Sequence, residues 1–237
     1  MPAAGSSSRM ELGKHQPQKV LYSFSDGESV LEKSLNCLNQ AGIKNAVIAT
    51  SANILEEVKE LVSEKALKNQ AWNSIEVIEG GSTRFESVRN SLNFISSFRD
   101  GRLFKVVTIH DAARPFCNPN DIVDALRKVS DNLGVVLGVP VVNTIKVVDD
   151  NQIIKETLDR NMLFEIQTPQ SFPFAGLLKA YENSSSNSHF DDSQVFENDG
   201  GKVLISVSSR ENLKLTYSSD LLYFEHILKE LHPRLPK

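Results

Sequence analysis

Short runs of β-branched residues alternate with amphipathic helical patterns along most of this chain, and this alternation constrains the fold more than any other feature. It is typical of crossover units on a mainly parallel sheet, because each helix packs back onto a face of the sheet. We therefore expect an α/β fold with a mostly parallel sheet flanked by helices. The predicted strands are rich in Val and Ile, as strands buried on both faces are, and cover 46–50, 75–78, 106–109, 135–142 and 203–207.

The predicted helices lie between these strands. Apolar residues recur at helical spacing over 54–62, 88–95, 122–129 and 221–231. Asn118-Pro119 has the pattern of an N-cap followed by proline at the first helical position. Because no Pro/Gly/Ser-rich linker divides the 237 residues, we expect residues 1–237 to form one domain.

One stretch departs from the alternation. Two β-prone runs, 144–148 and 153–157, flank the polar turn 149–152, which is the pattern of a β-hairpin. We expect an arm over about 141–160 that projects from the main sheet. An arm needs a surface to pack on, and a second subunit is the expected one, so the hairpin predicts a homodimer.

Composition and charge exclude several functions. The balance of 26 Lys and Arg against 30 Asp and Glu gives a net charge of -4, which argues against general electrostatic binding to nucleic acid or anionic membranes. There is no apolar run of about 18 residues and no secretory pattern, so we expect a cytoplasmic protein. Cys37 and Cys117 match neither a metal cluster nor a disulfide framework and are expected to be buried thiols.

Two glycine-containing segments are candidates for binding anions. Segment 5–9 combines small residues with the fixed charge of Arg9, which suits backbone N–H groups that curl around phosphates; a flexible serine-rich terminus is the alternative. Segment 80–84 follows a predicted strand and opens a helix, where backbone donors favour an anion or a polar base edge. A Gly-rich turn is the alternative there.

Further polar groups follow predicted strands. Asp111 and Arg114 come directly after 106–109, and ligands of open α/β sheets bind outside the carboxyl ends of strands, although a structural salt bridge is the alternative. We expect His110 to orient its neighbours. Segment 167–170 is too polar for a core strand, and Lys214 lies between apolar neighbours, where a solvated strand lysine is the alternative.

These segments together favour phosphate chemistry. No Ser-His-Asp or Cys-His arrangement is evident, so we expect a reaction that depends on positioning and charge neutralisation rather than on a covalent nucleophile. The basic residues expected to converge at the strand ends are Arg9, Arg84, Arg114, Arg160 and Lys214.

Seven motifs in register resemble the 2-C-methyl-D-erythritol 4-phosphate cytidylyltransferase family over nearly the whole chain. They lie at 2–10, 80–88, 109–115, 139–146, 159–160, 167–170 and 212–214. The resemblance implies a Rossmann-like nucleotidyltransferase fold and a homodimer clasped by hairpin arms. It also implies Mg²⁺-dependent transfer of CMP from CTP to a sugar-alcohol phosphate, with release of pyrophosphate, in isoprenoid precursor biosynthesis.

The resemblance implies a role for each matching residue, and it assigns no metal ligand. The loop around CTP is Ala3, Ala4, Gly5, Ser6 and Ser7, and the segment that reads cytosine is Gly81, Ser82 and Ser87. The catalytic cations are Arg9, Lys19 and Lys214. The acceptor pocket is Asp111, Arg114, Thr144 and Thr168, joined across the dimer by Arg160 on the acceptor phosphate.

Four positions depart from the family pattern. The family has a β-strand before Pro-Ala-Ala-Gly, whereas here Met1 directly precedes Pro2, so we expect the central first strand to be missing. Lys19 is displaced by one position, Phe190 stands where the family has a threonine that contacts the acceptor, and Ser7 replaces a frequent glycine.

Three alternatives to this activity stay open, and the first is a sister activity of the same class. A ribitol 5-phosphate cytidylyltransferase shares the scaffold, and Phe190 keeps that reading open. The missing strand and the displaced Lys19 keep open a catalytically impaired paralogue that binds nucleotide. A nucleotide-sugar glycosyltransferase ranks last, because it needs an Asp-x-Asp metal motif where this chain has Asp111-Ala112-Ala113.

Overall fold

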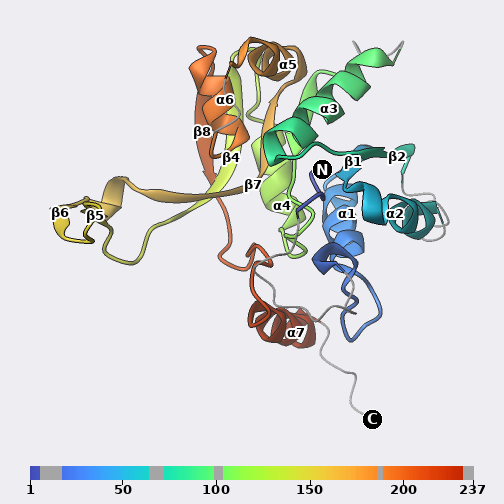
Figure 1. Cartoon of the computed structure of the whole chain (residues 1–237), viewed down its shortest axis with the longest axis horizontal. Coiled ribbons are helices and arrows are strands. Elements are labelled where there is room, and N and C mark those ends of the chain that lie inside the picture. The colour runs from blue at the N-terminus through green and yellow to red at the C-terminus, as the bar shows by residue number, and fades with distance from the viewer. Residues whose placement is uncertain (6–17, 64–71, 99–103, 186–188, 232–237) are drawn as a thin grey trace.

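The computed structural model describes residues 1–5, 18–63, 72–98, 104–185 and 189–231 (Figure 1). The strands are β1 (Asn45–Thr50), β2 (Ser74–Glu79), β3 (Val106–Ile109), β4 (Leu133–Pro140), β5 (Lys146–Val148), β6 (Ile154–Thr157), β7 (Phe164–Pro173) and β8 (Lys202–Val207). The α-helices are α1 (Val30–Gln40), α2 (Leu55–Leu61), α3 (Arg84–Ser97), α4 (Pro119–Leu126), α5 (Phe174–Asn183), α6 (Asp192–Asn198) and α7 (Asp220–Leu231).

The strands of the body form two groups. β1 and β2 pair in parallel, and the second group has the order β3-β7-β4-β8. In that group β4 and β8 are parallel, while β7 runs antiparallel to both β3 and β4. The predicted α/β fold with a largely parallel sheet is confirmed, with β7 as an antiparallel insertion.

The first three residues connect the two groups. Ala49 N donates to Met1 O at 3.0 Å, Ala3 N donates to Ala49 O at 2.7 Å, and Ala112 N donates to Pro2 O at 3.3 Å. The chain start therefore pairs in parallel with the end of β1 and contacts the segment after β3. Three residues thus supply the end of a central strand, and no longer strand forms at this place among the described residues.

An apolar cavity of about 440 Å³ lies beside Met1, where the rest of such a strand would run. Its walls include β1, β3 and the side chains of Leu38, Leu92 and Phe174. The Met1 ammonium lies buried and donates to Val47 O at 2.6 Å. Burial lowers the pKa of this amine from 8.0 to about 5. Within the described residues, this apolar space between β1 and β3 is not filled by a strand.

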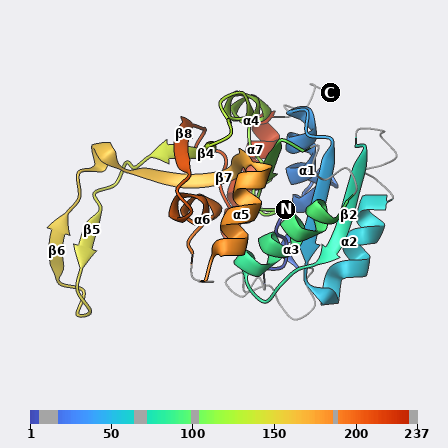
Figure 2. The ribbon, with the colours of Figure 1, turned by 90° about the horizontal axis from the view of Figure 1, so that it is seen from above.

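Helices cover both faces of the sheet, as Figure 2 shows from above. Residues of α1, α2 and α4 pack in one apolar cluster, whereas residues of α3, α5 and α6 pack in another. Cys37 and Cys117 are free thiols buried in the first cluster, as predicted. Asn118 caps α4 by accepting from Asn120 N at 3.0 Å, so the predicted helix start is confirmed. Among the described helices, none is both long and apolar enough to cross a bilayer.

The interpretation of 167–170 as too polar for a core strand is wrong, since these residues lie buried in β7. Their polar groups are compensated by partners that are distant in the sequence. Gln167 Oε1 accepts from Asn212 Nδ2 at 2.9 Å, and Gln170 Oε1 accepts from Ser193 N at 3.0 Å. A buried polar group costs little once its hydrogen bonds are made, so polarity alone does not exclude a core strand.

The predicted hairpin is present as a pair of antiparallel strands, β5 and β6, with Lys146 opposite Thr157. The Asp149 carboxylate accepts from Asn151 N and Ile153 N, both at 3.0 Å, and so fixes the turn. The arm stands well away from the body (Figure 2) and exposes Val148, Ile153 and Ile154. Its role in dimerisation stays a prediction.

Candidate active site

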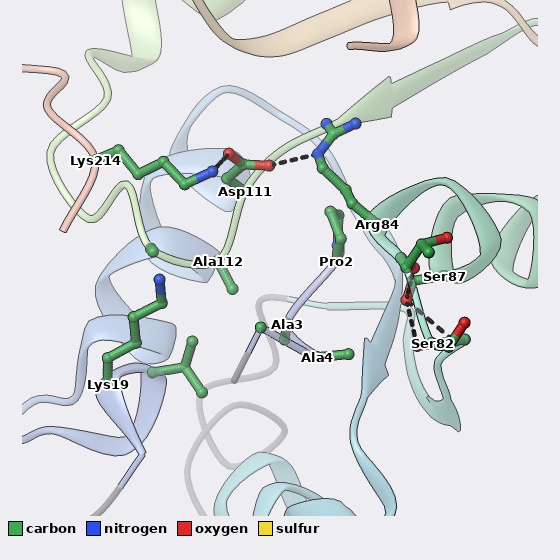
Figure 3. A pocket seen from close by; sticks show the side chains of 15 residues that line it. Pro2, Ala3, Ala4, Lys19, Ser82, Arg84, Ser87, Asp111, Ala112 and Lys214 are labelled. Carbon is green, nitrogen blue, oxygen red and sulfur yellow. Dashed lines mark hydrogen bonds and ion pairs between the residues drawn. The ribbon is translucent and has the colours of Figure 1, made fainter. Parts of the chain in front are cut away.

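A polar cavity of about 360 Å³ opens beside the chain start, beyond the carboxyl ends of β2 and β3 (Figure 3). It lies where ligands of open α/β sheets bind. Many of the residues predicted for the site line this one cavity, namely Ala3, Ala4, Gly5, Lys19, Gly81, Ser82, Ser87, Asp111 and Lys214. The structure therefore brings together segments from both ends of the chain.

The segment before α3 forms one wall. Thr83 and Glu86 make a capping box at the start of the helix, while Gly81 N donates to Ser87 Oγ at 3.0 Å. A Cβ added to Gly81 would lie 2.2 Å from the Cβ of Glu86, so this turn requires glycine. The wall consequently offers small side chains and backbone groups to a ligand.

Asp111 is the centre of the charged part of the cavity. Lys214 Nζ lies 2.6 Å from Asp111 Oδ2, and Arg84 Nε lies 3.2 Å from Asp111 Oδ1. Figure 3 shows the two cations approaching the carboxylate from opposite sides. Burial acts to raise the pKa of Asp111, but the charges of Arg84 and Lys214 outweigh it and hold this pKa well below its usual range. Asp111 is therefore ionised at neutral pH.

Arg84 also contacts a second carboxylate, behind the cavity. Its Nη1 and Nη2 donate to Asp192 Oδ1 and Oδ2 at 3.1 and 2.6 Å, and Tyr181 Oη donates to Asp192 Oδ1 at 2.6 Å. Burial acts to lower the pKa of Arg84, yet the Asp192 and Asp111 carboxylates raise it above its ordinary value. Asp192 and Tyr181 were missed in the sequence, where an acid at the start of a helix indicates only a cap.

Arg114 and Thr168 lie directly behind Asp111. Thr168 Oγ1 accepts from Asp111 N at 3.0 Å and lies 3.3 Å from His110 Nδ1. Arg114 Nη1 donates to Asn212 O at 2.7 Å, while its buried Nε has no partner among the described residues. His110 is fully buried with Nε2 3.1 Å from Arg114 O, which agrees with the orienting role expected for it.

Other predicted site residues lie elsewhere. Thr144 and Arg160 are exposed on or beside the arm, where Arg160 Nη1 donates to Val142 O at 2.8 Å. Phe190 is 93% exposed and is not among the described residues that line the cavity. Lys19 lines the cavity despite its displaced position. Ser6, Ser7 and Arg9 lie outside the described residues.

The described residues do not form a metal site of their own. They contain no cluster of three or more His, Cys, Asp or Glu that could hold a metal ion. Among the described residues that line the cavity, Asp111 carries the one carboxylate, and both of its oxygens already contact cations. No metal ligand is therefore assigned to this chain.

The fold and this cavity define the class of α/β enzymes that act on nucleotide phosphates, because small residues and cations converge beyond the strand ends. The model of the 2-C-methyl-D-erythritol 4-phosphate cytidylyltransferase family matches residues 1–230. The chain belongs to this family and is a cytidylyltransferase.

Individual relatives agree over most of their length. The chain is 34% identical to the 2-C-methyl-D-erythritol 4-phosphate cytidylyltransferase of Prochlorococcus marinus strain MIT 9312, with 98% of each chain covered. It is 36% identical to that of Clostridioides difficile over 74% of this chain and 72% of the relative. The 4-diphosphocytidyl-2C-methyl-D-erythritol synthase structure from Anaerococcus prevotii superposes with a TM-score of 0.75 at 25% identity, covering 96% and 95% of the two chains.

Proposed function

We propose that the cavity around Asp111 and Lys214 performs the family's reaction, in which CMP passes from CTP to 2-C-methyl-D-erythritol 4-phosphate and pyrophosphate is released. One observation carries this proposal. Lys19 and Lys214 both line the cavity, and residues 81–84, the Gly81 segment, form one of its walls. The reaction belongs to isoprenoid precursor biosynthesis.

The chemistry needs cations more than it needs a base. A phosphate monoester has a second pKa of about 6, so at neutral pH the acceptor already carries a nucleophilic oxygen. That anion must approach the α-phosphorus of a polyanionic nucleotide, and the main barrier is charge repulsion. In this proposal Lys19, Lys214 and Arg9 supply positive charge. Lys214 lines the cavity and contacts Asp111, which belongs to the proposed acceptor pocket, so it would lie near both substrates.

The nucleotide would occupy the side of the cavity formed by small residues. Gly81, Ser82 and Ser87 would read the cytosine through backbone and hydroxyl groups. Loop 3–7, with Ala3, Ala4, Gly5, Ser6 and Ser7, would surround the triphosphate. Mg²⁺ would enter with CTP, whose phosphate oxygens are typical ligands for this ion, and would neutralise charge there.

The acceptor would bind between two subunits. Asp111, Arg114 and Thr168 lie together in one body, since Asp111 O accepts from Arg114 N at 3.1 Å and Thr168 Oγ1 accepts from Asp111 N at 3.0 Å. Thr144 and Arg160 would come from the arm of the second subunit of a homodimer. The exposed apolar residues of the arm, Val148, Ile153 and Ile154, support an interface there.

The test of this function is pyrophosphate release from CTP and Mg²⁺ with two acceptors in parallel, 2-C-methyl-D-erythritol 4-phosphate and ribitol 5-phosphate. Turnover with the first acceptor alone is the expected result. Turnover with only the second would overturn the acceptor assignment. CTP binding without turnover on either acceptor would instead indicate the impaired nucleotide-binding paralogue.

A further inference from the structure

A line of alternating charges runs from outside the cavity into it. Tyr181 on α5 donates to Asp192 on α6, Asp192 binds Arg84 at the start of α3, and Arg84 binds Asp111, which binds Lys214. Asp192 is fully buried, and neither it nor Tyr181 is among the described residues that line the cavity. Their contact with the site therefore passes through Arg84.

The two cations on Asp111 differ in how firmly they are held. Three of the five N–H donors of Arg84 are used, two of them in a bidentate pair with Asp192, which fixes the plane of the guanidinium group. Phe85, the next residue of α3, stacks on Tyr181 with ring centroids 4.7 Å apart. Lys214 Nζ has Asp111 as its carboxylate partner and a flexible four-carbon side chain. Arg84 is thus anchored, whereas Lys214 can turn.

We propose that Asp192 and Tyr181 are positioning residues that hold Arg84 on Asp111, so that Asp111 stays in place while Lys214 exchanges this carboxylate for a substrate phosphate. The inference rests on the proposed function and adds two residues to it. Each oxygen of Asp111 contacts one cation, so the departure of Lys214 leaves Asp111 still paired. Without Asp192, Arg84 could also leave Asp111 and bind the substrate phosphate. Asp111 would then lose both of its cationic partners.

The kinetic test compares Asp192→Asn with a matched control on the same pair of helices. Asp199→Asn removes a carboxylate that contacts Asn183 and Lys179, between α6 and α5, and does not touch Arg84. We expect Asp192→Asn to lower kcat by roughly tenfold or more while the KM for CTP changes by less than about threefold. The control should keep the wild-type kcat. Equal loss in both variants would show that helix packing alone is involved.

Two further variants keep the test valid if Asp192→Asn folds poorly. Tyr181→Phe removes only the hydroxyl that contacts Asp192 and should lower kcat by roughly two- to fivefold at an unchanged melting temperature. In a Lys214→Ala background, Asp192→Asn should change kcat by less than about twofold, because the exchange no longer occurs. Losses that multiply in the double variant would overturn the proposal.

A crystal structure of the CTP complex tests the exchange without any turnover. Lys214 Nζ should lie within hydrogen-bond distance of a phosphate oxygen and beyond about 4 Å from Asp111 Oδ2, with Arg84 Nε still on Asp111 Oδ1. A complex in which Lys214 stays on Asp111 would refute the exchange, whatever acceptor the enzyme uses. A wild-type enzyme that releases no pyrophosphate from CTP with either acceptor would instead refute the proposed function.

Discussion

The ammonium of Lys214 lies 2.6 Å from Asp111 Oδ2, although the two residues are 103 positions apart in the sequence. Asp111 follows strand β3, whereas Lys214 lies between β8 and α7. Their contact joins the middle of the polypeptide to its C-terminal part at one cavity. It gives an enzyme with a net charge of -4 a local positive group next to an ionised carboxylate.

Gly81→Ala should weaken nucleotide binding. The new Cβ would lie 2.2 Å from the Cβ of Glu86, so the turn before α3 must shift and carry Ser82 and Ser87 with it. We expect the KM for CTP to rise by roughly tenfold, which corresponds to about 1.4 kcal/mol. Steady-state kinetics measure this, with Ser97→Ala at the far end of α3 as the control. An unchanged KM in a folded variant would remove the Gly81 segment from the CTP site.

Arg160 should act in the active site of the other subunit. Arg160→Ala is expected to raise the KM for the acceptor, and Lys214→Ala to lower kcat, so each variant alone has low activity. Mixed after dissociation, the two should recover up to about a quarter of wild-type activity, because each heterodimer then holds one site with both residues intact. Recovery requires that Arg160 crosses the interface. A mixture as inactive as its components would place Arg160 in its own subunit's site or in none.

The Met1 amine predicts a pH dependence of stability in a chain that starts at this residue. Its pKa is about 5 in the folded protein and 8.0 when exposed, so between these values the unfolded chain binds a proton that the folded chain does not. The free energy of unfolding should therefore fall as the pH is lowered from 8 to 5. Thermal melts across this window measure the effect. Acetylation of the amine should flatten it, and an unaltered slope would contradict the assignment.

The cavity beside Met1 predicts that added residues stabilise the fold. Five apolar, β-prone residues joined ahead of Met1 should pair with β1 and fill the space lined by Leu38, Leu92 and Phe174. We expect the melting temperature to rise by roughly 5 °C or more. An extension of five Gly and Ser residues is the control, since it removes the amine without filling the cavity. Equal melting temperatures for both extensions would show that the cavity does not accept a strand.

Much of the fold could be predicted because its signals are local. β1, β3 and β8 are short β-branched runs, and α4 has Asn118 and Pro119 at its start. β7 could not, because its polar residues become acceptable only through partners such as Asn212 and Ser193, which the topology places beside them. α5 was missed since it begins directly at the end of β7, after Pro173, without a side-chain cap in the described structure.

In the candidate site too, residues with local sequence signals could be predicted, whereas contacts between distant residues could not. Gly81 and Asp111 became candidates because they follow predicted strands, and Lys214 because it lies between apolar neighbours, while the role of each came from the resemblance to the family. The pairing of Arg84 with Asp192 joins residues 108 positions apart, and no spacing in the sequence indicates it. Long-range polar contacts are therefore the part of the site that only the structure supplies.

The central claim, that the Lys214 cavity performs cytidylyl transfer, is tested most directly by pyrophosphate release from CTP, Mg²⁺ and 2-C-methyl-D-erythritol 4-phosphate by the wild type and by Lys214→Ala. The wild type should turn over, and the variant should lose kcat by about a hundredfold or more while still folding and binding CTP. A folded Lys214→Ala variant with wild-type kcat would contradict the account.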